Sequence, residues 1–218
     1  MTVTVVVAED HLLVREGLRQ LLDGGDTTVL ATADDLPSLQ AAVTEHRPAV
    51  VITDLRMPPT GTDEGIRAAR WLREAHPDTG LLLLSQYLDV GGALALLADG
   101  GRGRGYLLKQ HVTRPDVVRR AVREVGDGGC YVDPDVVELL VHRASSRSRL
   151  AALTSRELEV LAQMAQGRSN TAIARELFVT YRAVEKHINS LFAKLGLAEE
   201  DSVHRRVAAV LMYLDEQP

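Results

Sequence analysis

The chain has 218 residues, of which 45% are hydrophobic and 25% are charged, and its formal net charge is −5 at pH 7. This composition is ordinary for a globular protein and excludes a chain that is disordered throughout. The length predicts one large domain or two small ones, and the single cysteine, Cys130, excludes an internal disulfide and a cysteine-based zinc cluster.

No apolar run approaches the roughly 20 residues that span a bilayer, and the start of the chain lacks the basic and apolar regions of a signal peptide. We therefore expect a cytoplasmic protein that has no membrane partner. The charge is unevenly distributed: residues 1–142 are acidic overall, 143–196 are basic, and 197–218 are acidic again. A basic region of this kind is compatible with nucleic-acid binding.

Residues 1–128 alternate between short apolar runs and amphipathic stretches. The runs are rich in Val and Leu and predict strands buried on both faces of a parallel sheet: Val3–Ala8, Val29–Ala33, Val50–Thr53, Leu81–Ser85 and Tyr106–Leu108. The stretches between them predict helices near 11–23, 36–46, 64–76 and 90–99, and a fifth helix capped by Thr113. Five β-α units predict a doubly wound α/β domain with five parallel strands.

Glycines at 126, 128 and 129 are expected to end that domain. Asp133-Pro134 predicts the start of a short helix over 134–143, and the polar run Ser145–Arg149 predicts a linker. The sequence thus divides into a domain over 1–128, a linker with a short helix over 129–149, and a second domain over 150–218.

The second domain shows only helical patterns. Thr154 and Glu157 form a capping box ahead of the first helix, Ser169 is expected to cap a helix over about 170–177, and longer helices are expected over about 181–195 and 201–214. The short break at Phe178–Thr180 between the second and third helices predicts a helix-turn-helix within a small all-α domain.

Polar side chains follow the predicted strands of the first domain. Glu9 and Asp10 follow the first strand, Asp54 the third, Ser85 ends the fourth, and Lys109 follows the fifth. In parallel α/β sheets the binding sites lie at the carboxyl ends of the strands, so these groups are expected to converge at that edge of the sheet. Clustered carboxylates favour a hard cation such as Mg²⁺. An Asp can accept a phosphoryl group, which the Lys ammonium and the Ser hydroxyl would stabilise.

At these residues the chain resembles the receiver domains of two-component response regulators. The resemblance rests on Glu9-Asp10, the run Asp54–Pro58, Ser85, and the run Gly105–Lys109. It implies that Asp54 is phosphorylated by a sensor histidine kinase and that Lys109 contacts the phosphate, with Ser85 and Tyr106 forming a conformational switch. It also implies that Mg²⁺ is bound, by the following ligands: Glu9, Asp10, Asp54 and the backbone carbonyl of Arg56.

Two departures from the receiver pattern support an alternative, a receiver that acts without phosphorylation through protein interactions, whereas the retained Glu9, Asp10, Asp54 and Lys109 argue against it. The segment from Pro58 to Gly65 is longer than usual, and Gln86 stands where a small residue is typical. The glycine-rich run Gly100–Gly105 is also unusual. An enzyme is disfavoured, because a haloacid-dehalogenase-like phosphatase needs a second acid where Arg56 stands, and Ser85 has no histidine partner arranged for nucleophilic catalysis.

The predicted helix over 181–195 has an apolar stripe and an opposite face of polar and small residues that suits a DNA major groove. The stripe consists of Val184, Ile188, Leu191, Phe192 and Leu195. Together with the run Leu153–Leu161, the run Gly167–Ala174 and Lys194-Leu195-Gly196, this helix resembles the LuxR-type helix-turn-helix of the NarL/FixJ family. The resemblance implies promoter DNA as a partner, base-edge contacts from Glu185, Lys186 and Asn189, and phosphate contacts from Arg182, His187 and Lys194. Ala183 replaces a threonine that is usual in the family.

Val203, Val207, Leu211 and Leu214 form one apolar stripe on the last predicted helix. Either this stripe closes the core of its own domain, or part of it faces a second subunit. LuxR-type domains pair through this helix, so the resemblance implies a homodimer on DNA, with two recognition helices about one DNA turn apart.

Overall fold

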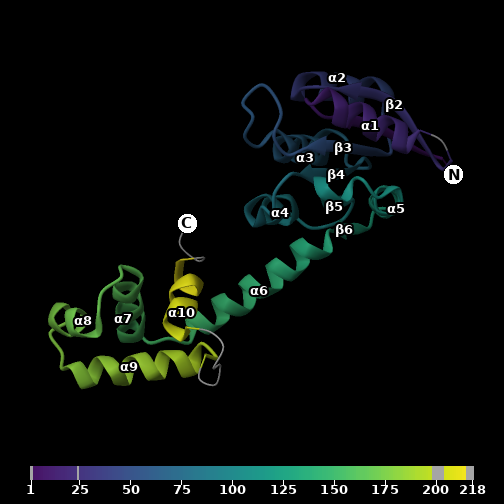
Figure 1. Ribbon diagram of the computed structural model, residues 1–218. Coiled ribbons are helices and arrows are strands. Elements are labelled where there is room, and N and C mark those ends of the chain that lie inside the picture. The colour runs from purple at the N-terminus through teal and green to yellow at the C-terminus, as the bar shows by residue number, and fades with distance from the viewer. Residues whose placement is uncertain (1, 24, 198–203, 215–218) are drawn as a thin grey trace. The chain divides into compact units, whose positions relative to one another are not determined.

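The computed structural model describes residues 2–23, 25–197 and 204–214, and the chain divides into two compact units, residues 1–138 and 139–218 (Figure 1). Each unit has its own core. Among the described residues, none of the helices combines the length and the apolar character needed to cross a membrane.

A parallel sheet of six strands forms the centre of the first unit, in the order β2-β1-β3-β4-β5-β6. Its strands are β1 Val3–Ala8, β2 Thr27–Ala33, β3 Val50–Asp54, β4 Gly80–Ser85, β5 Arg104–Leu108 and β6 Cys130–Val132. β3, β4 and β5 are buried along their whole length, as expected for strands with helices on both faces.

The sequence-based expectation of five strands was wrong by one. β6 pairs with β5, with Cys130 opposite Arg104 and Val132 opposite Tyr106. Three residues are too short to show a periodic pattern, so the strand exists only because the edge of β5 offers it a partner. The carboxylate of Asp133, which follows β6, links it to the end of β5 by accepting a hydrogen bond from the Leu108 amide at 3.1 Å.

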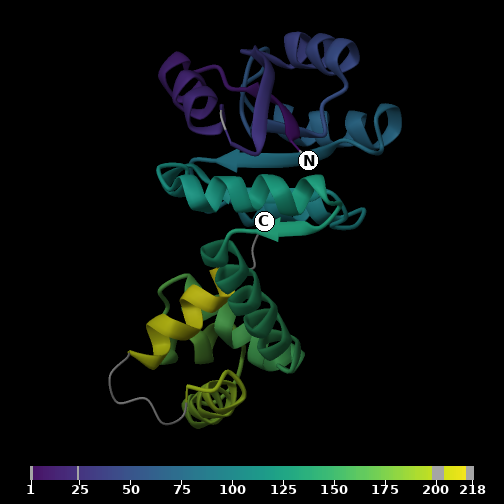
Figure 2. The ribbon, with the colours of Figure 1, turned by 90° about the vertical axis from the view of Figure 1, so that its right-hand side faces the viewer.

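Two layers of helices cover the sheet. The helices are α1 Leu12–Leu22, α2 Leu36–His46, α3 Glu64–Ala75, α4 Val90–Leu97 and α5 Pro115–Gly126. α1 and α5 lie on one face, and α2, α3 and α4 lie on the other (Figure 1, Figure 2). One core cluster joins Leu18 of α1 and Val122 of α5 to strand residues such as Ile52.

Two boundaries differ from the sequence-based expectation. Thr113 does not cap α5: the N-cap is Arg114, and Pro115 occupies the first turn, where its fixed φ and missing N–H carry no penalty. The helix expected over 134–143 continues as α6, Pro134–Ala151. The polar run Ser145–Arg149 is therefore helical. It contains no glycine or proline that would end a helix.

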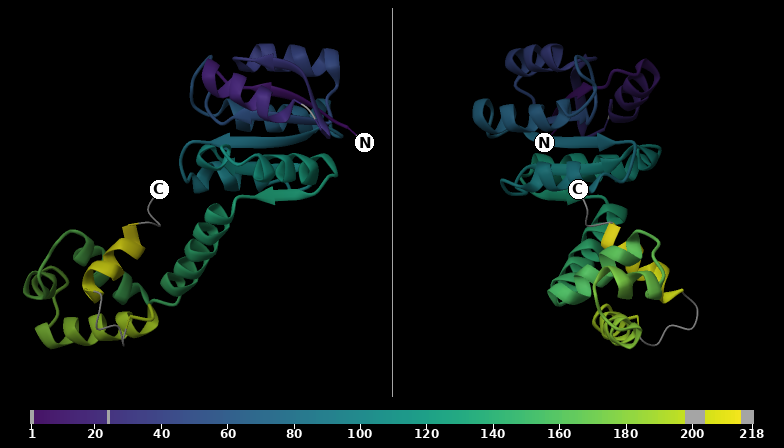
Figure 3. Two further views of the ribbon diagram at one scale, coloured as in Figure 1. Left: turned by 45° about the vertical axis from the view of Figure 1, so that its right-hand side comes forward. Right: turned by 90° about the vertical axis from the view of Figure 1, so that its left-hand side faces the viewer.

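The second unit contains α7 Ser155–Ala165, α8 Asn170–Glu176, α9 Tyr181–Lys194 and α10 Arg205–Leu214. α7 packs against both α9 and α10, and α8 packs against α9 (Figure 1, Figure 3). The expected caps at Thr154 and Ser169 both accept a hydrogen bond from a backbone amide, and so does Thr180, which the structure shows to cap α9. The turn between α8 and α9 reverses at Phe178, whose φ of 55° lies in the left-handed region.

The apolar stripe expected on α9 is confirmed, because all five of its residues are buried in the core of the second unit. On α10 the described stripe residues behave differently. Val207, Leu211 and Leu214 are 54%, 60% and 50% exposed, and Ala209 is the buried residue of this helix. Val203 lies outside the described residues. The expectation that the stripe closes the domain's own core is thus wrong for Val207, Leu211 and Leu214.

Candidate functional site

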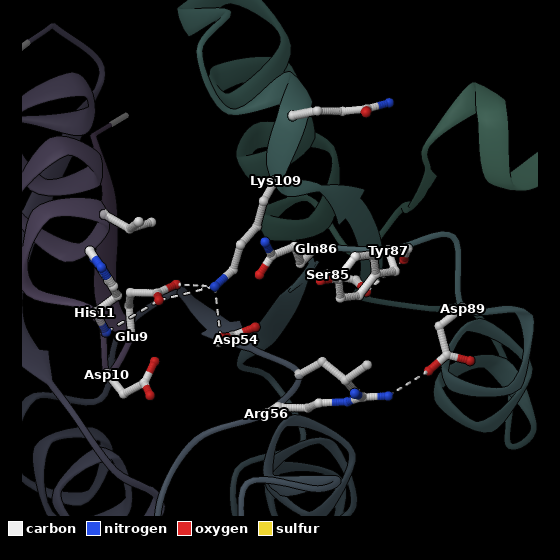
Figure 4. A pocket seen from close by; sticks show the side chains of 13 residues that line it. Glu9, Asp10, His11, Asp54, Arg56, Ser85, Gln86, Tyr87, Asp89 and Lys109 are labelled. Atoms are coloured by element: carbon white, nitrogen blue, oxygen red, sulfur yellow. Dashed lines mark hydrogen bonds and ion pairs between the residues drawn. The ribbon is translucent and has the colours of Figure 1, made fainter.

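An open pocket of about 790 Å³ lies at the carboxyl ends of β1, β3, β4 and β5. It is lined by nearly every residue of the first unit that the sequence pointed to, including Glu9, Asp10, Asp54, Ser85 and Lys109. Figure 4 shows the side chains of Glu9, Asp54 and Lys109 turned toward one another. The convergence follows from topology, since parallel strands bring distant segments to one edge of the sheet.

Lys109 neutralises the centre of this pocket. Its Nζ lies 2.7 Å from Oδ2 of Asp54, and 3.0 and 2.8 Å from Oε1 and Oε2 of Glu9. Burial by itself lowers the pKa of Lys109, but the hydrogen bonds and charges of Asp54 and Glu9 raise it overall. The lysine therefore stays protonated and holds two carboxylates that would otherwise repel each other.

The Glu9 carboxylate is fully buried, and the only contact of its Oε2 among the described residues is the ion pair with Lys109 at 2.8 Å. Burial is the largest influence on the pKa of Glu9 and raises it, and the nearby charge of Asp54 raises it further, against the opposing effect of Lys109. Oxygens from Glu9, Asp10 and Asp54 lie within 4.8 Å of one another. Three hard oxygen donors, two of them from buried residues and all of them close together, fit a divalent cation such as Mg²⁺.

The two expected switch residues lie beside the acid pocket and are both held by the segment that leads into α4. Ser85 Oγ donates a hydrogen bond to the carbonyl of Tyr87 at 2.8 Å, and the hydroxyl of Tyr106 donates to the carbonyl of Asp89 at 3.2 Å. The Tyr106 side chain is fully buried. Burial raises the pKa of its phenol, which therefore remains a hydrogen-bond donor at neutral pH.

Glu64 organises the long loop after Pro58, and nothing in the sequence reasoning pointed to it. Its buried carboxylate accepts hydrogen bonds from the amides of Thr60 and Thr62, both at 3.0 Å, and from the Thr60 hydroxyl. Burial alone would raise the pKa of Glu64, but these bonds lower it to about 2. A glutamate in the first turn of α3 is the signal that was available, because a negative charge is favoured at the N-terminus of a helix.

Arg56 and Gln86 occupy the rim of the acid pocket. The Arg56 side chain is 59% exposed, and its guanidinium lies 4.0 Å from the Asp89 carboxylate. Gln86 is exposed and lines the pocket, and Figure 4 draws it between Lys109 and Ser85. Both residues thus border the pocket that contains Asp54.

In the second unit, α9 presents an exposed polar face. Arg182, Glu185, Lys186 and Asn189 are exposed, and His187 is half-buried. Arg182 and Lys186 form no ion pair with any residue that the structure describes. Two cations without acidic partners on one helix face suit an anionic partner.

Lys194 differs from the other expected DNA contacts. Its Nζ lies 2.7 Å from Oε2 of Glu157, a buried carboxylate that also accepts hydrogen bonds from Ser190 Oγ at 2.6 Å and from the Thr154 amide at 2.7 Å. Burial alone would raise the pKa of Glu157, but these donors lower it to about 2. Lys194 thus connects the end of α9 to the start of α7 through Glu157.

A parallel α/β unit with an acid pocket, joined to a helix-turn-helix unit, is the architecture of a DNA-binding response regulator. Residues 5–121 match the family model of the response regulator receiver domain, and residues 151–212 match that of the bacterial regulatory proteins of the luxR family. The chain therefore belongs to the response regulators of two-component systems that carry a LuxR-type helix-turn-helix.

Individual relatives agree with this assignment. The oxygen regulatory protein NreC of Staphylococcus epidermidis is 36% identical over 204 residues, which cover 88% of this chain and 91% of NreC. A structure of the RcsB response regulator of Salmonella typhimurium is 26% identical with a TM-score of 0.60 and covers 98% of both chains. A structure of two RcsB dimers bound to two parallel DNAs is 26% identical, has a TM-score of 0.56 and covers 100% of both chains.

Proposed function

We propose that this response regulator receives a phosphoryl group on Asp54 from a sensor histidine kinase and thereby controls its own binding to promoter DNA. The observation that carries the proposal is the contact of Lys109 with both Asp54 and Glu9 in an open pocket. Because DNA is the target, the protein would act in the cytoplasm. Its relatives are transcription regulators, so we propose no enzymatic turnover of a separate substrate.

Asp54 would act as the nucleophile of the transfer. Its Oδ2 is held by Lys109, and its other carboxylate oxygen is free of hydrogen bonds within the described structure. That oxygen attacks phosphorus, the bond between phosphorus and the kinase's histidine nitrogen breaks, and the electron pair stays on the imidazole. Mg²⁺ held by Glu9, Asp10, Asp54 and the Arg56 carbonyl would supply charge neutralisation, and Lys109 would contact the transferred oxygens.

Ser85 and Tyr106 would relay the change. A phosphoryl oxygen on Asp54 competes with the Tyr87 carbonyl for the Ser85 hydroxyl. Losing that bond releases the segment 87–89, which Tyr106 also holds through the Asp89 carbonyl. The segment and the tyrosine form an element with two arrangements that a local charge can bias.

We propose that the second unit binds DNA through α9 and pairs with a second copy through α10. Glu185, Lys186 and Asn189 would reach base edges, and Arg182 and His187 would contact phosphates. The exposed side chains of Val207, Leu211 and Leu214 support the pairing, since a small domain gains little from three exposed aliphatic residues on one helix. In this proposal, residues 1–128 form the receiver domain, residues 129–149 form the linker, and residues 150–218 form the DNA-binding domain.

Mass spectrometry tests the phosphoryl transfer. Incubation with Mg²⁺ and a small phosphodonor should add one phosphoryl mass to the wild type and none to Asp54→Asn, and chelation should abolish the gain. Glu45→Gln, an exposed carboxylate on α2, is the control and should be modified like the wild type. A wild type that no donor modifies would favour the phosphorylation-independent alternative based on Gln86 and the long loop.

Binding to DNA tests the helical unit separately. With a site selected from random sequence by the wild type, Lys186→Ala should lose about 1–3 kcal/mol more on that site than on unselected DNA if Lys186 reads a base. Equal losses on both DNAs would reassign Lys186 to the phosphate backbone.

A further inference from the structure

A second pocket of about 440 Å³ opens at the opposite edge of the sheet, where β4 and β5 begin. Three arginines line it: Arg73 of α3, Arg102 of the glycine-rich run, and Arg104 of β5. We call it the arginine pocket. Asp78 and Asp127 also line it, but neither carboxylate lies within 4.0 Å of a guanidinium nitrogen of these arginines. The pocket therefore holds three guanidinium groups and two carboxylates, and no ion pair joins them among the described residues.

Arg104 is the unusual member. The residue is 3% exposed, although a buried guanidinium normally pairs with a carboxylate or a phosphate. Its Nη1 donates to the carbonyls of Thr79 and Gly103 at 3.3 and 2.9 Å. Its Nε is buried without any acceptor, and Nη2 makes no hydrogen bond in the described structure. The edge formed by Nε and Nη2 is the one that grips an oxyanion with two parallel bonds.

The other two arginines that line this pocket also have guanidinium N–H groups without an acceptor among the described residues. Arg73 is half-buried and uses Nη1 and Nη2 on the carbonyls of Asp99 and Gly100, at 2.7 and 3.3 Å. Arg102 is exposed and has no partner in the described structure. Burial lowers the pKa of Arg104, and the charge of Arg73 lowers it further. An anion would relieve both effects, because it replaces lost hydration and separates two like charges.

The glycine-rich run shapes this pocket. Gly103 has a φ of 63° and donates its amide to the carbonyls of Gly128 and Gly129, so the backbone of the run lies against the turn that follows α5. Arg102 and Arg104 flank Gly103 in the sequence, and this turn brings both of their side chains to one pocket. The receiver chemistry at Asp54 does not explain why the glycine-rich run carries two arginines.

We propose that the arginine pocket binds a small anion that bears phosphate groups, held by Arg73, Arg102 and the free edge of Arg104. Three guanidinium groups that pair with neither carboxylate of the pocket offer more donors than a single carboxylate can use, and they suit an anion with several phosphate oxygens. The site is separate from the acid pocket and does not depend on phosphorylation of Asp54.

Isothermal titration of the full chain with inorganic pyrophosphate tests the proposal. The buffer contains EDTA and little salt, so that no metal ion can recruit pyrophosphate to Glu9, Asp10 and Asp54. One binding site per chain is expected, with an affinity that falls as salt is added. Arg102→Ala removes a side chain without internal partners and should weaken binding about tenfold, as expected for a charge-assisted bond.

Arg70→Ala is the matched control, because Arg70 is an exposed arginine on α3 that does not line the pocket. It should leave the affinity unchanged within about twofold. Arg104→Gln replaces the buried guanidinium by a shorter neutral amide and should abolish binding, while the circular dichroism spectrum should stay native. No heat at millimolar pyrophosphate, equal losses in Arg70→Ala and Arg102→Ala, or citrate binding as tightly as pyrophosphate would each overturn the proposal.

Discussion

The Nζ of Lys109 lies 2.7 Å from Oδ2 of Asp54, although 55 positions separate the two residues in the sequence. The same nitrogen contacts the buried carboxylate of Glu9. One cation thus offsets two carboxylates and leaves the pocket electrostatically short of one positive charge. That deficit, together with the exposed Asp10 next to Glu9, is the physical basis of the first prediction.

Mg²⁺ should raise the melting temperature of the wild type. A ligand that binds only the folded state stabilises it by about 2.7 kcal/mol at a hundredfold excess over Kd. Differential scanning calorimetry should show this effect at pH 7.5 and a smaller one near pH 5, because the raised pKa of Glu9 lets protons compete with the metal. Asp10→Asn should reduce the stabilisation strongly and Glu45→Gln should not. Equal stabilisation in both variants would place the metal elsewhere.

Glu64→Gln should destabilise the first unit by about 1–3 kcal/mol, because a buried carboxylate that accepts several hydrogen bonds is replaced by a group that both donates and accepts. The pKa of Glu64 is about 2, below its ordinary value of 4.5. The stabilisation is therefore complete above pH 4.5 and is lost as the pH falls toward 2. Urea unfolding at pH 7 and pH 3 should show a smaller difference between variant and wild type at pH 3. Glu74→Gln, exposed on the same helix, should behave like the wild type at both values.

Lys194→Met should lower the free energy of unfolding and leave the salt dependence of DNA binding nearly unchanged. The reason is that the Lys194 ammonium is already bound to Glu157. Removing it leaves a buried carboxylate with one donor fewer, at a cost of about 1–3 kcal/mol. Arg182→Ala should do the opposite: stability stays the same, and the slope of log K against log salt falls by about one. Fluorescence anisotropy over a salt series, together with urea unfolding, measures both. A reduced slope in Lys194→Met would restore Lys194 as a phosphate contact.

Leu211→Glu should weaken cooperative binding to a palindromic site by about tenfold or more, because it places a charge in the proposed contact between two copies of α10. Leu211 is 60% exposed, so the change should leave the monomer folded. Leu94→Glu introduces the same charge at a leucine of α4 that is 56% exposed, and it should leave DNA binding unchanged. Analytical ultracentrifugation on DNA should show two wild-type chains per site. A wild type that binds one chain per site contradicts the dimer.

The sequence by itself determined much of the fold, because the deciding signals are local. Apolar runs identified the first five strands, and the capping residues Thr154 and Ser169 marked the starts of α7 and α8. The convergence of Glu9, Asp54 and Lys109 was also predictable, since parallel strands must end at a common edge. The buried stripe of α9 followed from its period of 3.6 residues.

Only the tertiary structure decided which distant segments and polar groups contact one another. β6 forms because β5 has a free edge, and Lys194 is bound to Glu157 because α7 and α9 are packed together. Likewise, the exposure of Leu211 and the burial of Arg104 without a carboxylate depend on what the rest of the chain covers. Periodicity and caps are properties of a few neighbouring residues, whereas the pairing of a charge depends on segments that folding brings together from far apart in the sequence.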